Sequence, residues 1–410
     1  MFQKSLTISN QLKTATLVFF LLFVAIFRLQ TTSSFLCHYY FLSQSLAQGK
    51  LDVTEQINNC FNPPPGKIIS NDFAIFKGQY FIYLGILPAI IGLPLIFFNQ
   101  AIYEIALVTF FLGLSIISLS KIINHFLKNK QLIIPLAIFI ASPALTNLAF
   151  VGPWYLAGLI TFSLGLLFLW LYQIKNKNWA IVLIGAMFLT IPTTIFYALI
   201  PLADIFLKPK EKNQKFIFLI LTLVIALLIF GSYNYFRFGH PLETGYKYAT
   251  VPPERFMDSR KNEKPITILL SNAFYYLINP PRVHMNQALR ATFPFFELHR
   301  YGVGLLFSMP WFLLYFIFQR QKRKDWVYLT STFLIAITIF YFSGGGSRQI
   351  GPRHATDFLP ILIYIYFKEL SKNKRYLPLA NKIFNFSLFL NIYFYFLAIT
   401  GFLKMYPELP

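Results

Sequence analysis

The stretch NDFAIFKGQYFIYLGILPAIIGLP (residues 71–94) joins a polar, charged run to an apolar run that glycine and proline interrupt. The glycines and prolines between Gly85 and Pro94 would weaken or kink a helix that crossed a membrane here. We therefore expect residues 80–98 to stay on one side of the membrane. Asp72 would then lie at the water interface beside a lipid-facing surface, where a carboxylate can act on a substrate that is part soluble and part lipid.

The composition of the whole chain is that of a membrane protein. Of its 410 residues, 56% are hydrophobic and only 12% are charged, and apolar runs of about 18 to 22 residues recur along it. Because lipid offers no partner to a backbone amide, such runs are expected to be helices. The sequence predicts an all-α, polytopic membrane protein, with residues 1–410 forming a single domain.

The formal net charge of +21 is concentrated in short loops between apolar runs. Short basic loops stay in the cytoplasm. The basic residues are therefore interpreted as setting the orientation of the chain in the membrane, and nucleic acid is not expected as a partner. The loop residues are Lys121, Lys128, Lys130, Lys175, Lys177, Lys208, Lys210, Lys212, Lys215, Arg320, Lys322, Arg323, Lys324, Lys368, Lys372, Lys374 and Arg375.

The basic loops decide whether the chain crosses the membrane at two segments, residues 80–98 and residues 179–207. If residues 80–98 and 103–120 both crossed, the basic loop at 121–130 would lie outside, whereas a non-crossing segment at 80–98 puts it inside. Residues 179–207 are long for one span and contain two prolines. A hairpin of two half-helices would keep both basic flanks cytoplasmic, and one tilted crossing would not.

The resulting topology has about nine full spans plus broken or juxtamembrane helices. The chain starts in the cytoplasm, because Lys4 and Lys13 precede an apolar run that no cleavage site follows. Three segments lie outside: residues 29–102, 234–302 and 344–356. The spans are residues 15–27, 103–120, 132–149, 153–172, 216–233, 303–319, 326–343, 356–369 and 382–403.

Most acids and histidines fall in the three outside segments, so we place function on that face. Cys37 and Cys60 both lie in the first of them. An outside compartment permits a disulfide between them, and burial of Cys37 near a helix end is the alternative.

Four stretches in order carry a family resemblance: HYYFLSQSLAQGKLDV (38–53), DFAIFKGQYFIYLGILPAIIGLPL (72–95), YNYFRFGHPLETGYKY (233–248) and SGGGSRQIGPRHATDFLPIL (343–362). Together they resemble bacterial membrane proteins of the GT-C superfamily of glycosyltransferases, of the protein O-mannosyltransferase and lipid A aminoarabinose transferase type. The resemblance implies an inner-membrane enzyme with juxtamembrane helices in its first periplasmic loop. It also implies a polyprenyl-phosphate sugar donor, an envelope glycan, lipid or protein as acceptor, and a loop carboxylate as base.

The better-known members carry an acid soon after the first span, and TTSSFLCHYY (31–40) has none. Either His38 or a later acid therefore supplies the general base, or the chain is not a transferase of that mechanism. Asp72 is the first candidate, and a helix cap or a solvated loop acid is its alternative role. Asp52 and Glu55 follow.

Substrate-binding candidates lie in all three outside segments. Arginines before the span at 356–369 could hold the donor phosphate or anchor the chain at the interface, and Asp357 could pair with Arg353. Tyrosines suit sugar faces and are also ordinary interfacial residues. The candidates are Lys77, Tyr80, Arg237, Glu243, Tyr246, Arg348, Arg353, His354 and Asp357.

No cofactor is predicted, and a divalent cation stays an option although the histidines lack metal-ligand spacing. The leading hypothesis is sugar transfer on the outer face. A non-catalytic transporter or flippase of a lipid-linked saccharide is the alternative, and a scaffold of an envelope-assembly complex is a third. A transporter would carry ionisable residues at mid-membrane, and the chain has few, mainly Asp204 near the end of a span.

Overall fold

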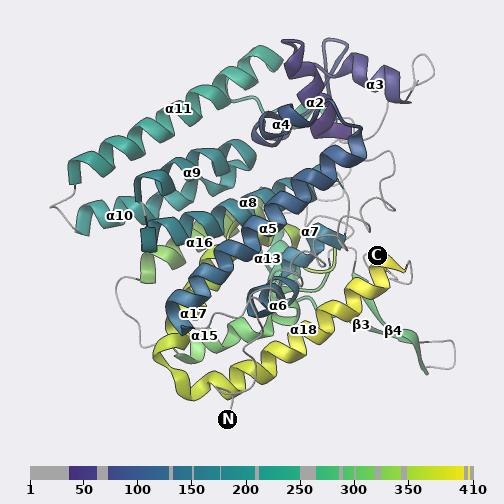
Figure 1. Cartoon of the computed structure of the whole chain (residues 1–410). Helices are drawn as coiled ribbons and strands as arrows, with labels where there is room; N and C mark the ends of the chain where they lie inside the picture. The colour runs from purple at the N-terminus through teal and green to yellow at the C-terminus, as the bar shows by residue number, and fades with distance from the viewer. Residues whose placement is uncertain are drawn as a thin grey trace.

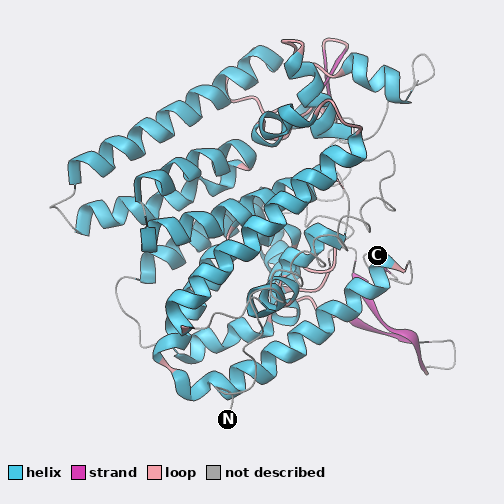
Figure 2. Cartoon of the chain, viewed as in Figure 1, coloured by secondary structure: helices cyan, strands magenta, loops and turns pink. Residues whose placement is uncertain are grey.

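The computed structural model describes residues 37–61, 73–128, 133–149, 152–175, 177–207, 212–249, 265–285, 290–299, 302–318, 325–342, 349–400 and 405–406. This part of the chain is mostly helical, with a few short strands (Figures 1 and 2). The predicted first span at 15–27 lies outside the described residues.

The α-helices are α2 (Cys37–Ala47), α3 (Thr54–Phe61), α4 (Leu87–Gly92), α5 (Gln100–Leu127), α6 (Ile133–Ile140), α7 (Thr146–Ala149), α8 (Pro153–Trp170), α9 (Lys177–Thr190), α10 (Leu199–Leu207), α11 (Lys212–Phe238), α13 (Pro265–Leu277), α14 (Leu305–Ser308), α15 (Leu313–Phe318), α16 (Trp326–Phe342), α17 (Leu359–Lys372) and α18 (Leu377–Ile399). The short 3-10 or π turns are η1 (Leu93–Leu95), η2 (Pro143–Leu145), η3 (Leu171–Lys175), η4 (Pro192–Ala198), η6 (Tyr246–Tyr248), η8 (Pro310–Phe312), η10 (Arg353–Asp357) and η11 (Lys374–Tyr376). The strands are β1 (Ala74–Phe76), β2 (Gln79–Phe81), β3 (Arg282–Met285), β4 (Ala291–His299) and β5 (Met405–Tyr406).

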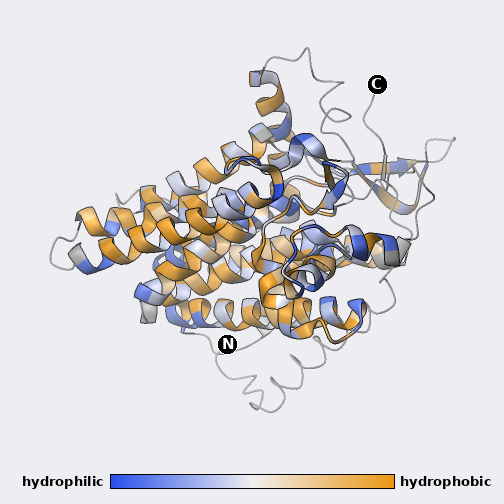
Figure 3. Cartoon of the chain, turned by 90° about the horizontal axis from the view of Figure 1, so that it is seen from above, coloured by the Kyte–Doolittle hydropathy of each residue, from blue (hydrophilic) through white to orange (hydrophobic). Residues whose placement is uncertain are grey.

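Three helices of the described part are long and apolar enough to cross a membrane: Gln100–Leu127, Pro153–Gln173 and Gln214–Phe238. The first has 28 residues, a rise of about 42 Å, which exceeds the roughly 30 Å of a hydrocarbon core. The third exposes apolar side chains along most of its length, a surface that suits lipid tails. Figure 3 shows hydrophobic residues over the helices through the middle of the bundle.

Helix α8 is the centre of the bundle. It packs against α5, α9 and α17, and its side chains are buried on all sides. A helix that is hydrophobic all round must be covered all round. Helix α17 is itself buried along most of its length, so α8 and α17 together form the interior of the bundle.

Residues 80–98 form no spanning helix, as the sequence predicts. They contain the end of β2, the six residues of α4 and the three residues of η1. Pro88 and Pro94 each stand at the start of their helical turn, where a missing N–H costs least. A six-residue helix rises only about 9 Å.

The predicted hairpin at residues 179–207 is also present. Helix α9 ends at Thr190, Ile191 has an extended backbone, and Pro192 starts η4, which leads into α10. The chain doubles back so far that Lys177 Nζ lies 3.2 Å from Asp204 Oδ2. Both flanks of the segment are therefore at the same end of the bundle.

The bundle has two chemically different ends. At one, which we call the basic end, Tyr172 donates to Asp204 over 3.1 Å, and Lys368 pairs with Asp325. At the other, the loop end, the described parts of the segments predicted to lie outside meet. There Ala74 forms a β-bridge with Ala249.

The structure differs from the all-α prediction in its strands. Residues 74–81 form the antiparallel pair β1–β2. Its two-residue turn is Lys77-Gly78, and both residues have positive φ (51° and 79°), the turn geometry that matches strand twist. Strands β3, β4 and β5 form a second sheet.

Two predicted spans, 132–149 and 303–319, are broken rather than continuous. In the first, Ser142 is extended before Pro143. In the second, Met309 leaves the helical conformation before Pro310. A residue that precedes proline is pushed out of the α region by the proline ring, which explains both breaks.

Candidate functional site

Aromatic side chains from three distant parts of the chain meet at the loop end. The ring of Trp154, at the start of α8, lies 5.8 Å from that of Tyr83 and 6.4 Å from that of Tyr246. The imidazole of His354 lies 6.1 Å from the same indole, edge to face. We call Tyr83, Trp154, Tyr246, Arg353 and His354 the Trp154 cluster.

Arg353 is the cation of this cluster. Pro352 is extended and starts η10, and the backbone N–H of Arg353 donates to Gln349 Oε1 over 3.0 Å. Its guanidinium carbon lies 5.1 Å from the ring of Tyr155 and 5.9 Å from the ring of Trp154. These contacts fix a planar cation whose terminal amino groups suit a phosphate.

His354 accepts a hydrogen bond from Arg353, whose Nε lies 3.3 Å from His354 Nε2. Desolvation, together with the charge of Arg353, lowers the pKa of His354 from 6.5 to about 3. The imidazole is therefore neutral at pH 7 and can accept from the guanidinium. It orients Arg353 without adding a second positive charge.

This arrangement makes stability sensitive to acid. Because the folded-state pKa of His354 lies below its unfolded value, stability is complete above about pH 6.5 and falls as the pH drops towards 3. We expect wild type to lose up to about 1.4 kcal/mol per pH unit in this window. His354→Gln, which keeps an acceptor without a titrating group, is expected to show a shallower slope in thermal unfolding at pH 4 to 7. An identical slope in both proteins would contradict the assignment.

Asp357 lies one turn beyond Arg353 and is buried, with 2% of its surface exposed. Thr193 Oγ1 donates to its Oδ2 over 2.8 Å, and Oδ1 has no hydrogen-bond partner in the described part of the chain. This bond joins η10 to the break in the 177–207 hairpin. The structure thus gives Asp357 a partner on η4.

The catalytic candidates lie in and around α2. His38 is buried, and its imidazole stacks on the ring of Phe73 at 4.4 Å. Asp72, the residue before Phe73, lies outside the described residues. Asp52 Oδ1 accepts from the backbone N–H of Thr54 over 3.4 Å, the geometry of an Asx turn before α3.

The remaining first-loop candidates are less enclosed. Glu55 is exposed and pairs with Lys50 at 3.1 Å. Lys77 is exposed at the tip of the β1–β2 turn. The backbone N–H of Tyr80 donates to Thr54 Oγ1, which ties the hairpin to α3.

Arg237, near the end of α11, is buried and stabilises the packing of this helix. It is 3% exposed, it donates to the carbonyl oxygens of Tyr233 and Ile82, and its guanidinium carbon stacks 3.6 Å from the Tyr233 ring. Glu243 pairs with Lys247 at 2.5 Å. Of the predicted substrate-binding residues, Tyr246, Arg353 and His354 come together, and Arg237 and Glu243 make other contacts.

Several predictions stay open. Arg348 lies outside the described residues, and so do the side chains of Cys37 and Cys60, so their disulfide stays a prediction. Within the described ranges, no group of three metal-ligating side chains is present.

Sequence reasoning did not single out Trp154, Tyr83 or Thr193. Trp154 begins an apolar helix after Gly152 and Pro153, and tryptophan at such a position is ordinary in membrane proteins. Its contact with His354 joins residues two hundred apart in sequence and has no local signal.

Comparison with known proteins gives no neighbour. No protein-family model, no curated protein sequence and no solved structure matches the chain.

Proposed function

We propose that this protein is a membrane glycosyltransferase of the GT-C kind. It takes a sugar from a polyprenyl-phosphate donor and passes it to an envelope glycan, lipid or protein. The observation that carries the proposal is that one residue from each of the three predicted outside segments, Arg353 among them, contacts the ring of Trp154.

The chemistry of the cluster suits such a donor. A guanidinium binds phosphate through two parallel hydrogen bonds. His354, which accepts from Arg353 Nε, is neutral and carries no negative charge that would compete with a phosphate. Stabilising the departing phosphate is the main electrostatic task of this transfer. The rings of Tyr83, Trp154 and Tyr246 offer faces to a sugar.

The proposal includes the membrane arrangement: about nine spans in the inner membrane, an N-terminus in the cytoplasm, and the loop end outside. The separation of the basic end from the loop end supports it, because basic loops stay inside.

The distribution of buried charge argues for an enzyme over a transporter. Among the described residues, the buried carboxylates Asp325 and Glu369 pair with lysines at the basic end, and Glu104 is buried near the start of α5. Arg237 and Asp357 are buried at the loop end. A transporter would be expected to place such groups midway along its helices.

The test is sugar transfer by the purified protein in liposomes with radiolabelled polyprenyl-phosphate sugars and envelope acceptors. We expect Arg353→Ala to lower kcat/KM by about a hundredfold, the typical cost of removing one preorganised donor of positive potential. Arg353→Lys should keep part of the activity, because lysine keeps the positive charge but cannot form the two parallel hydrogen bonds of a guanidinium.

Arg375→Ala is the matched control, since Arg375 also stacks on a tyrosine but lies in η11. Equal activity of the Arg353 and Arg375 variants would refute the phosphate role. Movement of the lipid-linked sugar across the bilayer without transfer would favour the flippase alternative.

A further inference from the structure

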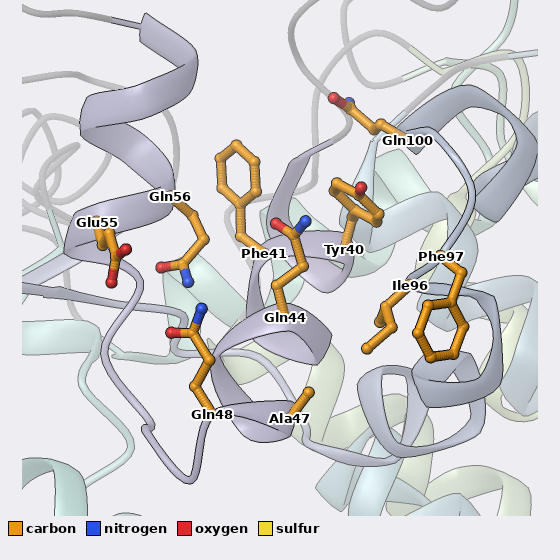
Figure 4. Close-up of a pocket in the computed structure, with 10 residues that line it drawn as sticks. All are labelled: Tyr40, Phe41, Gln44, Ala47, Gln48, Glu55, Gln56, Ile96, Phe97 and Gln100. Carbon is orange, nitrogen blue, oxygen red and sulfur yellow. The ribbon is translucent and has the colours of Figure 1, made fainter.

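A groove of 590 Å³ opens at the loop end (Figure 4). One wall is the face of α2 with Tyr40 and Gln44, which are four residues apart and so share a helix face, continued by Gln48 in the turn that follows α2. The opposite walls come from α3 and from the segment between η1 and α5. The volume lies within the roughly 300–1,000 Å³ of small-molecule sites.

Gln56 marks this groove as a binding site. Its side chain is only 7% exposed, and its Oε1 has no hydrogen-bond partner among the described residues. Figure 4 shows the amides of Gln48 and Gln56 directed towards one another across the groove, with Gln44 beside them. A buried amide oxygen without a partner costs free energy. Rotation of the Gln56 amide, which lies opposite that of Gln48, would turn this oxygen into the groove, where a ligand hydroxyl would remove that cost.

The lining specifies the chemistry of the ligand. The glutamine amides each offer donors and an acceptor, the pattern that a hydroxyl group matches. Among the described residues, no lysine or arginine lines the groove, and the one carboxylate that does, Glu55, pairs with Lys50 at 3.1 Å. A phosphate would need a cation here, so the ligand is uncharged.

Aromatic and aliphatic side chains complete the groove. Tyr40 is fixed by a hydrogen bond from its hydroxyl to the carbonyl oxygen of Phe98, over 3.1 Å. Phe97 is 89% exposed at the rim, beside the start of a helix able to cross a membrane. The groove therefore has an amide wall and an apolar rim next to the surface that suits lipid.

We infer that this groove binds an uncharged saccharide, the glycan part of the acceptor. Its role as acceptor rests on the proposed transfer, whereas saccharide binding does not. Polyols with apolar ring faces match amides on one side and aromatic rings on the other.

The experiment measures binding of maltotriose, mannotriose and chitotriose to the full-length protein in nanodiscs by saturation-transfer NMR and titration calorimetry. We expect at least one trisaccharide to bind, and Gln56→Leu and Gln44→Leu to weaken it by about tenfold each. Phe97→Ala is expected to weaken it by about fivefold.

Gln56→Leu separates binding from structure. Its amide oxygen has no partner to lose, so the thermal midpoint should stay the same or rise while binding falls. Gln79→Leu, an exposed amide at the start of β2, is the matched control and should bind as wild type does.

No binding of any trisaccharide, or equal binding by Gln56→Leu and wild type, would overturn the inference, and so would tighter binding of glucose 1-phosphate than of a neutral sugar. Arg353→Ala should lose transfer and keep saccharide binding. Groove-dependent binding in a protein without transfer would sustain this inference and sink the proposed function.

Discussion

Replacing Asp72 by asparagine is expected to lower sugar transfer by about a thousandfold, within the range of a lost general base. Asparagine is nearly the same size but cannot take a proton from an acceptor hydroxyl. The next residue, Phe73, is fully buried and stacks on His38, so the chain enters the bundle at this point. Transfer by wild type and variant in liposomes, with the same donor panel, measures the effect.

Asp52→Asn is the control, because Asp52 contacts a backbone N–H. It is expected to keep most of the activity. Full activity of Asp72→Asn would move the chemistry to Asp52, Glu55 or His38, and donor binding by the inactive variant would confirm that it is folded.

Gly85→Ala is expected to destabilise the protein by about 4 kcal/mol or more, at the high end for one added methyl group. A Cβ on Gly85 would lie 2.3 Å from the carbonyl oxygens of both Leu189 and Thr190. These atoms belong to the backbone at the end of α9, so no side-chain rotation relieves the clash. Thermal and denaturant unfolding in nanodiscs should show a large loss or no folded protein.

Gly231→Ala serves as the matched control. A Cβ there would lie 3.5 Å from Pro241 Cβ, an ordinary contact, and the residue is inside α11. Alanine should stabilise it by about 0.5–1 kcal/mol. Similar stabilities for the two alanine variants would show that residues 80–98 do not dock on α9 as described.

The path of the chain was predictable where the signal is local. Prolines and basic flanks predict that residues 80–98 do not span and that residues 179–207 double back. The structure has only short helical turns within residues 80–98 and brings the two flanks of the second segment together, and the side of the membrane on which residues 80–98 lie stays a prediction. The hairpin turn at Lys77-Gly78 was not predicted, because an all-α fold was expected.

The site was less predictable because its contacts are long-range. Tyr246, Arg353 and His354 were expected to be functional and do meet, but through Trp154, which reads in sequence as an ordinary helix start. The pairing of Asp357 with Thr193 depends on the fold of the 177–207 hairpin. Burial also distinguishes Arg237 from Arg353, and no sequence pattern does so.

Arg237 links the apolar helix α11 to the loop end. Helix α11 exposes apolar side chains along most of its length, so its tilt follows the thickness of the surrounding hydrocarbon. Near its end, Arg237 holds the carbonyl oxygen of Ile82, next to Tyr83 of the Trp154 cluster. A thinner or thicker membrane would therefore pull on the aromatic wall around Arg353, which makes the lipid itself a determinant of the site's geometry.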